Sequence, residues 1–141
     1  MFSPLAAALA AVALQAAPAA PAAPMTIVRE RDVMRRETPP PHGGVGESTA
    51  YRLSDQAPRR AMEFRKRVLH AGASIGLHVL THDEVYYVVE GEGEVTSDGD
   101  MRRIGPRTAA YLYEGSNVGI RQIGGGDLVL LISYPLKART K

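Results

Sequence analysis

The chain has 141 residues, a formal net charge of +2 and no cysteine. This length suits one domain, and the absence of thiols excludes disulfide bonds and thiolate metal sites. The basic residues are scattered and interrupted by acidic ones, whereas nucleic-acid binding requires a basic stripe with stacking aromatics or a reading helix. We therefore expect no nucleic-acid partner.

The first 24 residues carry no charged side chain, and they contain an apolar run, Leu5–Leu14, followed by a tract of alanine and proline. Ten apolar residues are too few to span a bilayer, so we expect no stable membrane insertion. The run matches the apolar region of a secretory signal, and Ala17-Pro18-Ala19 offers one cleavage site. We predict that residues 1–24 are a signal peptide and leader of a periplasmic or secreted bacterial protein. A disordered leader is the alternative.

Residues 25–60 form an N-terminal strand and loop segment. Met25–Arg36 suits a first strand followed by a short turn or helix, and Glu37–Glu47 is a loop rich in proline and glycine. Ser48–Leu53 can form a short strand, and the polar stretch Ser54–Arg60 suits a turn.

From residue 61 to residue 136, short β-rich runs alternate with turn residues, and no window has convincing helical periodicity. The expected strands are Glu63–Leu69, Ser74–Leu80, Val85–Val89, Glu92–Thr96, Arg102–Ile104, Thr108–Tyr113, Val118–Ile123 and Leu128–Tyr134. Strands at spacings of about 8–12 residues are typical of a sandwich or closed barrel. The pair Asp98-Gly99 predicts a tight hairpin turn, because that turn needs positive φ. Residues 137–141 form a basic tail that we expect to fray.

The stretch that begins at Gly72 carries a motif. Five residues separate Gly72 from His78, Glu84 follows, and six further residues lead to Gly91. This spacing resembles the first motif of the cupin superfamily, in particular the small single-domain cupins with a type-2 conserved barrel. The resemblance implies an all-β jelly-roll barrel, also called a double-stranded β-helix, over residues 61–136. It also implies a homodimer, with Met25–Arg36 as a candidate for exchange between subunits.

The second motif of the family is present in its spacing but not in its chemistry. Gly115 is followed by Val118 where the family has a histidine, and by Gln122 where it has an asparagine. Leu80 stands at the position of the second histidine of the first motif. The resemblance therefore implies a retained fold with degenerate metal-binding motifs.

By the same resemblance, a cupin metal is held by three imidazoles and one carboxylate, a set that suits Mn, Fe, Ni, Cu or Zn. Only His78 and Glu84 remain of that set here, because Leu80 and Val118 have no lone pair to donate. His82 is a candidate third ligand: in one continuous strand it would share a face with the other two, but the family pattern puts a turn there. The alternative is a metal-free barrel in which Leu80 and Val118 fill the space of the metal. His78 and Glu84 would then form a hydrogen-bonded pair.

Two further side chains are expected in the barrel interior. Tyr86 has the parity of Glu84, and Gln122 has the parity of Val118, so each faces inward if its neighbour does. Tyr86 could contact a ligand or simply fill the barrel, whereas His42 in the loop is expected to face solvent. The expected pocket residues are His78, Leu80, Glu84, Tyr86, Val118 and Gln122.

Two functions remain open, because a fold alone does not choose a function. The first is an exported protein that binds a small molecule in the barrel, with weak or no metal binding. The second is a metal-dependent enzyme of the dioxygenase or isomerase type, in which His78, His82 and Glu84 hold a divalent ion. That ion would activate oxygen or polarise a substrate carbonyl.

Overall fold

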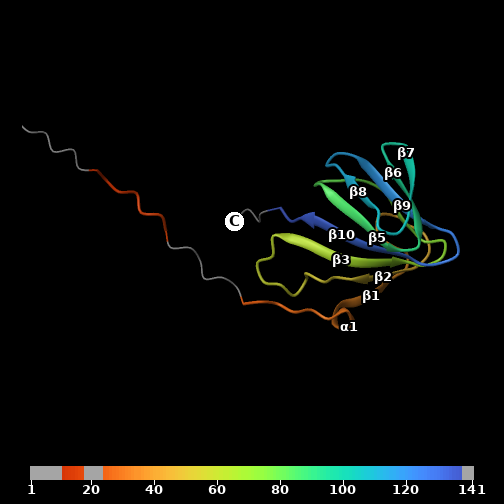
Figure 1. Ribbon diagram of the computed structural model, residues 1–141, viewed down its shortest axis with the longest axis horizontal. Coiled ribbons are helices and arrows are strands. Elements are labelled where there is room, and N and C mark those ends of the chain that lie inside the picture. Colours follow the sequence, from red (N-terminus) through yellow and green to blue (C-terminus); the bar gives the residue numbers. More distant parts are fainter. Residues whose placement is uncertain (1–10, 18–23, 138–141) are drawn as a thin grey trace, which may run out of the picture.

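The computed structural model describes residues 11–17 and 24–137. From Met34 onward the chain forms two antiparallel β-sheets with one hydrophobic core between them (Figure 1). The larger sheet has the strand order β1-β2-β3-β10-β5-β8, and the smaller sheet has the order β4-β9-β6-β7. Core side chains come from both sheets, with Leu69, Val88 and Leu130 on one side and Val118 and Ile120 on the other. The all-β fold expected from the sequence is confirmed.

A single helical turn, α1 (Glu30–Val33), precedes the strands in the chain. The strands are β1 (Met34–Glu37), β2 (Ser48–Tyr51), β3 (Met62–Leu69), β4 (Ser74–Val79), β5 (Glu84–Glu90), β6 (Glu92–Ser97), β7 (Asp100–Ile104), β8 (Ala109–Leu112), β9 (Asn117–Ile123) and β10 (Leu128–Pro135). The eight strands expected after residue 61 are all present, and each end differs from its prediction by two residues or fewer. The hairpin turn between β6 and β7 is also confirmed, since Asp98 and Gly99 have φ values of 48° and 82°.

The prediction for Met25–Arg36 is wrong in its order, because the helical turn α1 comes first and the strand β1 follows it. The strand forms at Met34–Glu37 because these residues pair with β2. The alternation of side chains at the start of Met25–Arg36 does not determine its place. β2 pairs in turn with β3, so the N-terminal segment extends the larger sheet of its own chain. Lys66 Nζ donates to Glu30 Oε2 at 2.6 Å and ties α1 to β3.

The predicted signal peptide and the end of the basic tail lie largely outside the described residues. Residues 1–10, 18–23 and 138–141 are not described, and these include part of the cleavage site Ala17-Pro18-Ala19. Residues 11–17 have no regular secondary structure. Within the described ranges, no helix has the length and apolar character needed to cross a bilayer.

The connection between β1 and β2, residues 38–47, lies against β4; we call it the strap. Ser74 N donates to Val45 O at 3.0 Å, and Gly76 N donates to Pro41 O at 3.3 Å. β4 is an edge strand of the smaller sheet and β1 is an edge strand of the larger one. The strap therefore covers an otherwise open strand edge and links the two sheets on one side of the barrel.

Candidate functional site

A cavity of about 310 Å³ lies between the strap and strands β3, β4, β5 and β10. This volume is at the lower end of the range for small-molecule sites. The lining is mostly polar and aromatic: Pro41, His42, Arg65, Arg67, Ile75, His78, Val79, Leu80, Thr81, His82, Glu84, Tyr86, Ile132 and Tyr134. Four of these side chains are histidine or tyrosine rings that contact one another in pairs.

Strand β3 contributes two arginines to this cavity that the sequence analysis did not identify as site residues. Along a strand, alternate side chains face the same side, and Leu69 belongs to the buried core. Arg67 and Arg65 have the same parity as Leu69, so they face the barrel interior, as does the buried Glu63. The signal was available in the sequence, because the predicted strand Glu63–Leu69 places three charged residues on the face of a core leucine.

Arg67 is only 1% exposed, and it joins three strands of the larger sheet. Its Nη1 donates to Ser48 Oγ at 2.9 Å and to the carboxylate of Glu37. Its Nε is buried without a hydrogen-bond partner. An unpaired buried N–H is costly, so Arg67 keeps one polar atom whose burial no hydrogen bond offsets.

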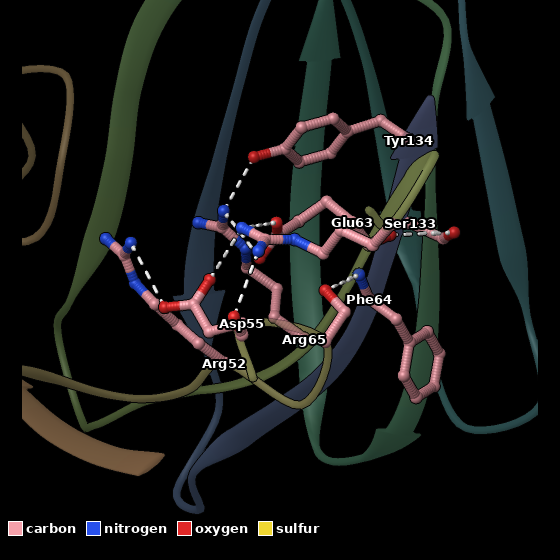
Figure 2. A network of polar contacts seen from close by, with 9 residues as sticks. Arg52, Asp55, Glu63, Phe64, Arg65, Ser133 and Tyr134 are labelled. Atoms are coloured by element: carbon pink, nitrogen blue, oxygen red, sulfur yellow. Dashed lines mark hydrogen bonds and ion pairs between the residues drawn. The ribbon is translucent and has the colours of Figure 1, made fainter. Parts of the chain in front are cut away.

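Arg65 has the same kind of environment (Figure 2). Its Nη2 donates to the Tyr134 hydroxyl at 2.6 Å and forms an ion pair with Glu63 Oε1 at 3.1 Å. Figure 2 shows the guanidinium between these two side chains, with the Arg52–Asp55 ion pair beyond them at 3.8 Å. The Nε of Arg65 is also buried without a hydrogen-bond partner. The two arginines are thus fixed through their terminal nitrogens while each retains an unused donor.

Glu84 and Tyr86 enter the cavity from β5, and both are buried. Burial raises the pKa of Glu84 to about 7, against the opposing attraction of Arg65 and Arg67. Burial also raises the pKa of Tyr86, and the negative charge of Glu84 adds to that rise, so Tyr86 is neutral at ordinary pH. The carboxyl group of Glu84 therefore changes its charge near neutral pH.

His78 is directed into the cavity by an irregularity in β4. Ile75 pairs with Ile120 and His78 pairs with Val118, so three steps along β4 correspond to two along β9. Paired residues point to the same face, and Ile120 and Val118 are both in the core, so His78 points inward as well. The predicted hydrogen bond with Glu84 is not found between the described side chains; His78 Nδ1 donates instead to the carbonyl of Gly76 at 2.9 Å.

His42 is exposed, as expected for this loop, and it also contacts the cavity. Its ring stacks on the ring of His78 with centroids 3.6 Å apart and planes 6° from parallel, and it lines the cavity. Burial lowers the pKa of His42, and the charges of His78, Arg67 and Arg65 lower it further. His42 is therefore a neutral ring at pH 7.

His82 lies in the turn between β4 and β5 and still lines the cavity. Its ring stacks on Tyr134 with centroids 4.2 Å apart, and its Nδ1 bonds to the carbonyl of Asp83 at 3.1 Å. The stacking on Tyr134, and not strand alternation, sets its direction.

Five of the predicted site residues line this one cavity, namely His78, Leu80, His82, Glu84 and Tyr86. Gln122 and Val118 do not line it, contrary to expectation. Val118 is completely buried in the core. Gln122 accepts a hydrogen bond from Gly72 N at 2.8 Å and donates to the carbonyls of Ile123, Gly124 and Gly126. The Gln122 amide thus bonds to the turn at Gly72 and to the turn at 123–126, so it has no donor left for a ligand.

The side chains present do not fit the metal site of the family. Within residues 11–17 and 24–137, no three His, Asp or Glu side chains are grouped so that they could hold a metal ion. His78 and His82 stack on different partners, His42 and Tyr134. Leu80, at 3% exposed, belongs with Val118 to the hydrophobic core cluster.

The raised pKa of Glu84 predicts a pH-dependent stability. The carboxyl pKa is 4.5 ordinarily and about 7 in the folded chain, so this group's contribution is fully present below pH 4.5 and is lost as pH rises through 7. The loss amounts to roughly 3 kcal/mol in the free energy of unfolding. Glu84→Gln cannot ionise, so its stability relative to the wild type should increase by that amount between these pH values. Urea unfolding of both proteins from pH 4 to pH 8 measures this difference, and parallel pH profiles would contradict it.

Comparison with known proteins supports the resemblance. A scan of protein-family models finds no match to this chain. An oxalate-binding protein of Thermotoga maritima is 30% identical over 108 residues, which cover 74% of this chain and 89% of that protein. The solved structure of a predicted oxalate decarboxylase, also from Thermotoga maritima, superposes with a TM-score of 0.69 at 27% identity. This match covers 79% of this chain and 99% of that one.

Two more distant structures share the fold. An RmlC-like cupin of Shewanella frigidimarina has a TM-score of 0.56 at 21% identity, covering 64% of this chain and 78% of that one. The polyketide cyclase RemF of Streptomyces resistomycificus has a TM-score of 0.66 at 23% identity, covering 79% of each chain. With the two-sheet barrel, the Gly72–Gly91 spacing and a relative matched over most of its length, the chain belongs to the cupin superfamily.

Proposed function

We propose that this protein binds a small dicarboxylate anion of the oxalate class in its barrel cavity. The observation that carries the proposal is the pair of arginines on β3, Arg65 and Arg67, whose side chains line the same cavity. A carboxylate is the natural partner for a guanidinium group, because charge-assisted hydrogen bonds between the two are short and strong. The relative that binds oxalate supports this class of ligand.

The fixed position of the arginines favours binding without large rearrangement. Glu63 and Tyr134 hold the Arg65 guanidinium, and Glu37 and Ser48 hold that of Arg67. Side chains that are already ordered lose little conformational entropy when a ligand arrives. Binding by arginine also requires no metal, which agrees with a cavity wall in which Leu80 replaces a metal ligand.

Isothermal titration calorimetry of the tag-free chain tests the proposal. Oxalate should bind much more tightly than the neutral isostere oxamide, because the oxamide carbonyls accept hydrogen bonds from the arginines without the charge of a carboxylate. Arg65→Gln keeps a donor for Glu63 but loses the charge, and it should weaken oxalate binding about tenfold or more. Arg103→Gln is the matched control, since Arg103 is 74% exposed and lies outside the cavity. Absence of oxalate binding by the wild type, with and without added metal, would refute the proposal.

The second candidate function is a metal-dependent enzyme, and one observation favours it: His78, His82 and Glu84 line the same cavity. Tag-free protein exposed to Mn, Fe, Ni, Cu or Zn and then assayed by elemental analysis decides between the two. Near-stoichiometric metal that disappears in His78→Ala would favour the enzyme over the metal-free binding protein.

We also propose that the chain is exported, on the basis of the uncharged first 24 residues and the apolar run Leu5–Leu14. The full sequence expressed in a bacterial host should yield a periplasmic protein that lacks the apolar run. Intact-mass spectrometry of the fractionated cells measures this loss. A full-length cytoplasmic product would contradict it.

A further inference from the structure

The two sheets differ in the side chains that they turn away from the core. On the smaller sheet several of these side chains are charged and paired: Arg121 Nε donates to Glu94 Oε1 at 2.8 Å, and Arg103 Nη2 lies 3.6 Å from Glu92 Oε2. On the larger sheet, strands β3, β10, β5 and β8 turn mostly apolar side chains outward, and we call this surface the outer apolar face. Five of its side chains are between 38% and 57% exposed, namely Met62, Phe64, Tyr87, Val89 and Tyr111.

Strand alternation creates the outer apolar face. On β3, Glu63 and Arg65 point into the barrel, so Met62 and Phe64 point outward. Figure 2 shows the Phe64 ring directed away from the cluster that Glu63 and Arg65 form. The exposed fractions of Met62 and Phe64 show that no other segment of the described chain covers this side of the sheet.

The extent of the outer apolar face suits a protein interface. Strands about 4.8 Å apart that rise about 3.4 Å per residue give β3, β10, β5 and β8 an outer surface of roughly 450 Å². An apolar patch of this size often marks an interaction site. Two such faces in contact would bury about 900 Å², close to the total of about 1,000 Å² at which specific interfaces begin. The turn α1 limits the face on the β3 side, where Lys66 Nζ donates to Glu30.

The outer apolar face is complementary to itself along β5. A groove of about 380 Å³ lies at one end of the strand, with Met62, Val85 and Tyr111 in its wall. Val89 projects from the same side of β5, about 13 Å further along. A two-fold axis across the middle of β5 would bring Val89 of each copy to the groove of the other. The same axis would place the two Tyr87 side chains against each other.

We propose that the outer apolar face docks against the same face of a second copy of this chain. Sheet faces pack on one another about 10 Å apart, with their side chains interdigitated. This dimer differs from an exchange of Met25–Arg36 between subunits, because β1 in that segment already pairs with β2 of its own chain. The dimer is also independent of which ligand occupies the cavity.

Sedimentation equilibrium of the tag-free chain, from about 1 μM to about 100 μM, tests the proposal. The measured mass should rise toward twice that of one chain as the concentration increases. Met62→Glu and Tyr87→Glu each introduce a charge twice into the symmetric interface, and each should raise the dimer dissociation constant about 100-fold or more. Met101→Glu is the matched control and should leave the dimer unchanged. Met101 is 56% exposed against 57% for Met62, but it lies on the smaller sheet.

A second measurement does not depend on the variants. Hydroxyl radicals oxidise exposed methionines, so in the wild type at high concentration Met62 should oxidise more slowly than Met101, and on dilution the two rates should converge. A wild type that sediments as a monomer throughout would overturn the proposal. A dimer that survives in folded Met62→Glu and Tyr87→Glu, or one in which Met62 is not protected, would also overturn it. If circular dichroism shows that a variant does not fold, the oxidation rates decide.

Discussion

Replacement of Arg67 by alanine is expected to lower the free energy of unfolding by about 3 kcal/mol. The guanidinium is 1% exposed and donates to Glu37 and Ser48, so its removal leaves a partly buried carboxylate and a fully buried hydroxyl without their donor. The loss of stability is this large because removing Arg67 leaves the Glu37 carboxylate without its positive partner. Urea unfolding with linear extrapolation measures the change.

A matched double variant tests whether the loss of stability in Arg67→Ala comes from the unpaired charge that it leaves behind. Arg67→Met with Glu37→Leu removes both charges and keeps apolar volume, so it should recover much of the stability lost in Arg67→Ala. Arg103→Ala, at an exposed ion pair, should change stability by less than about 1 kcal/mol. A comparably small effect of Arg67→Ala would show that Arg67 does not hold β1, β2 and β3 together.

The strands could be predicted from the sequence because turn residues mark their ends. Asp98-Gly99 and Gly124-Gly125-Gly126 break the apolar runs at places where the backbone must reverse, and strands are indeed found on either side. The jelly-roll barrel was predictable through the resemblance of the Gly72, His78, Glu84 and Gly91 spacing to the first cupin motif. The turn residues and the motif spacing can be read from short stretches of sequence, because they do not require knowledge of which distant segments come into contact.

The cavity was harder to predict, because its wall depends on contacts between distant segments. His42 reaches His78, which comes much later in the chain, only because the strap rests on Gly76. Gln122 has the inward parity that was predicted, but the carbonyls of a neighbouring turn take up its amide. Arg65 and Arg67 were predictable from parity alone, yet a charged side chain on a core-facing position runs against the usual pattern of burial.

The hydrophobic core explains how the fold persists with Leu80 and Val118 at two positions where the resemblance implies histidine. Leu80 and Val118 contribute apolar packing where a metal would contribute coordination bonds. In the proposed binding protein, the positive groups of the cavity are two arginines from a different strand, β3, and each of them also pairs with a carboxylate.

The double variant Leu80→His with Val118→His is expected to bind about one divalent transition metal ion per chain. Val118 is the Cα partner of His78, and Leu80 follows His78 by two residues. Together with His78 and Glu84, the two new imidazoles would complete the ligand set that the resemblance implies, three imidazoles and one carboxylate. Elemental analysis after exposure to Mn, Fe, Ni, Cu or Zn measures the metal content.

The same variant should be less stable without metal, because imidazoles replace two core side chains that are 3% and 0% exposed. The loss should be on the order of 2–5 kcal/mol, as for other disruptive core substitutions. A metal at 100 times its dissociation constant should restore about 2.7 kcal/mol, since it binds the folded state preferentially. Leu80→Gln with Val118→Gln is the matched control, which introduces polar groups of similar size without imidazoles and should gain no metal. A folded double-histidine variant that binds none of the five metals would show that Val118 does not occupy the histidine position of the second motif.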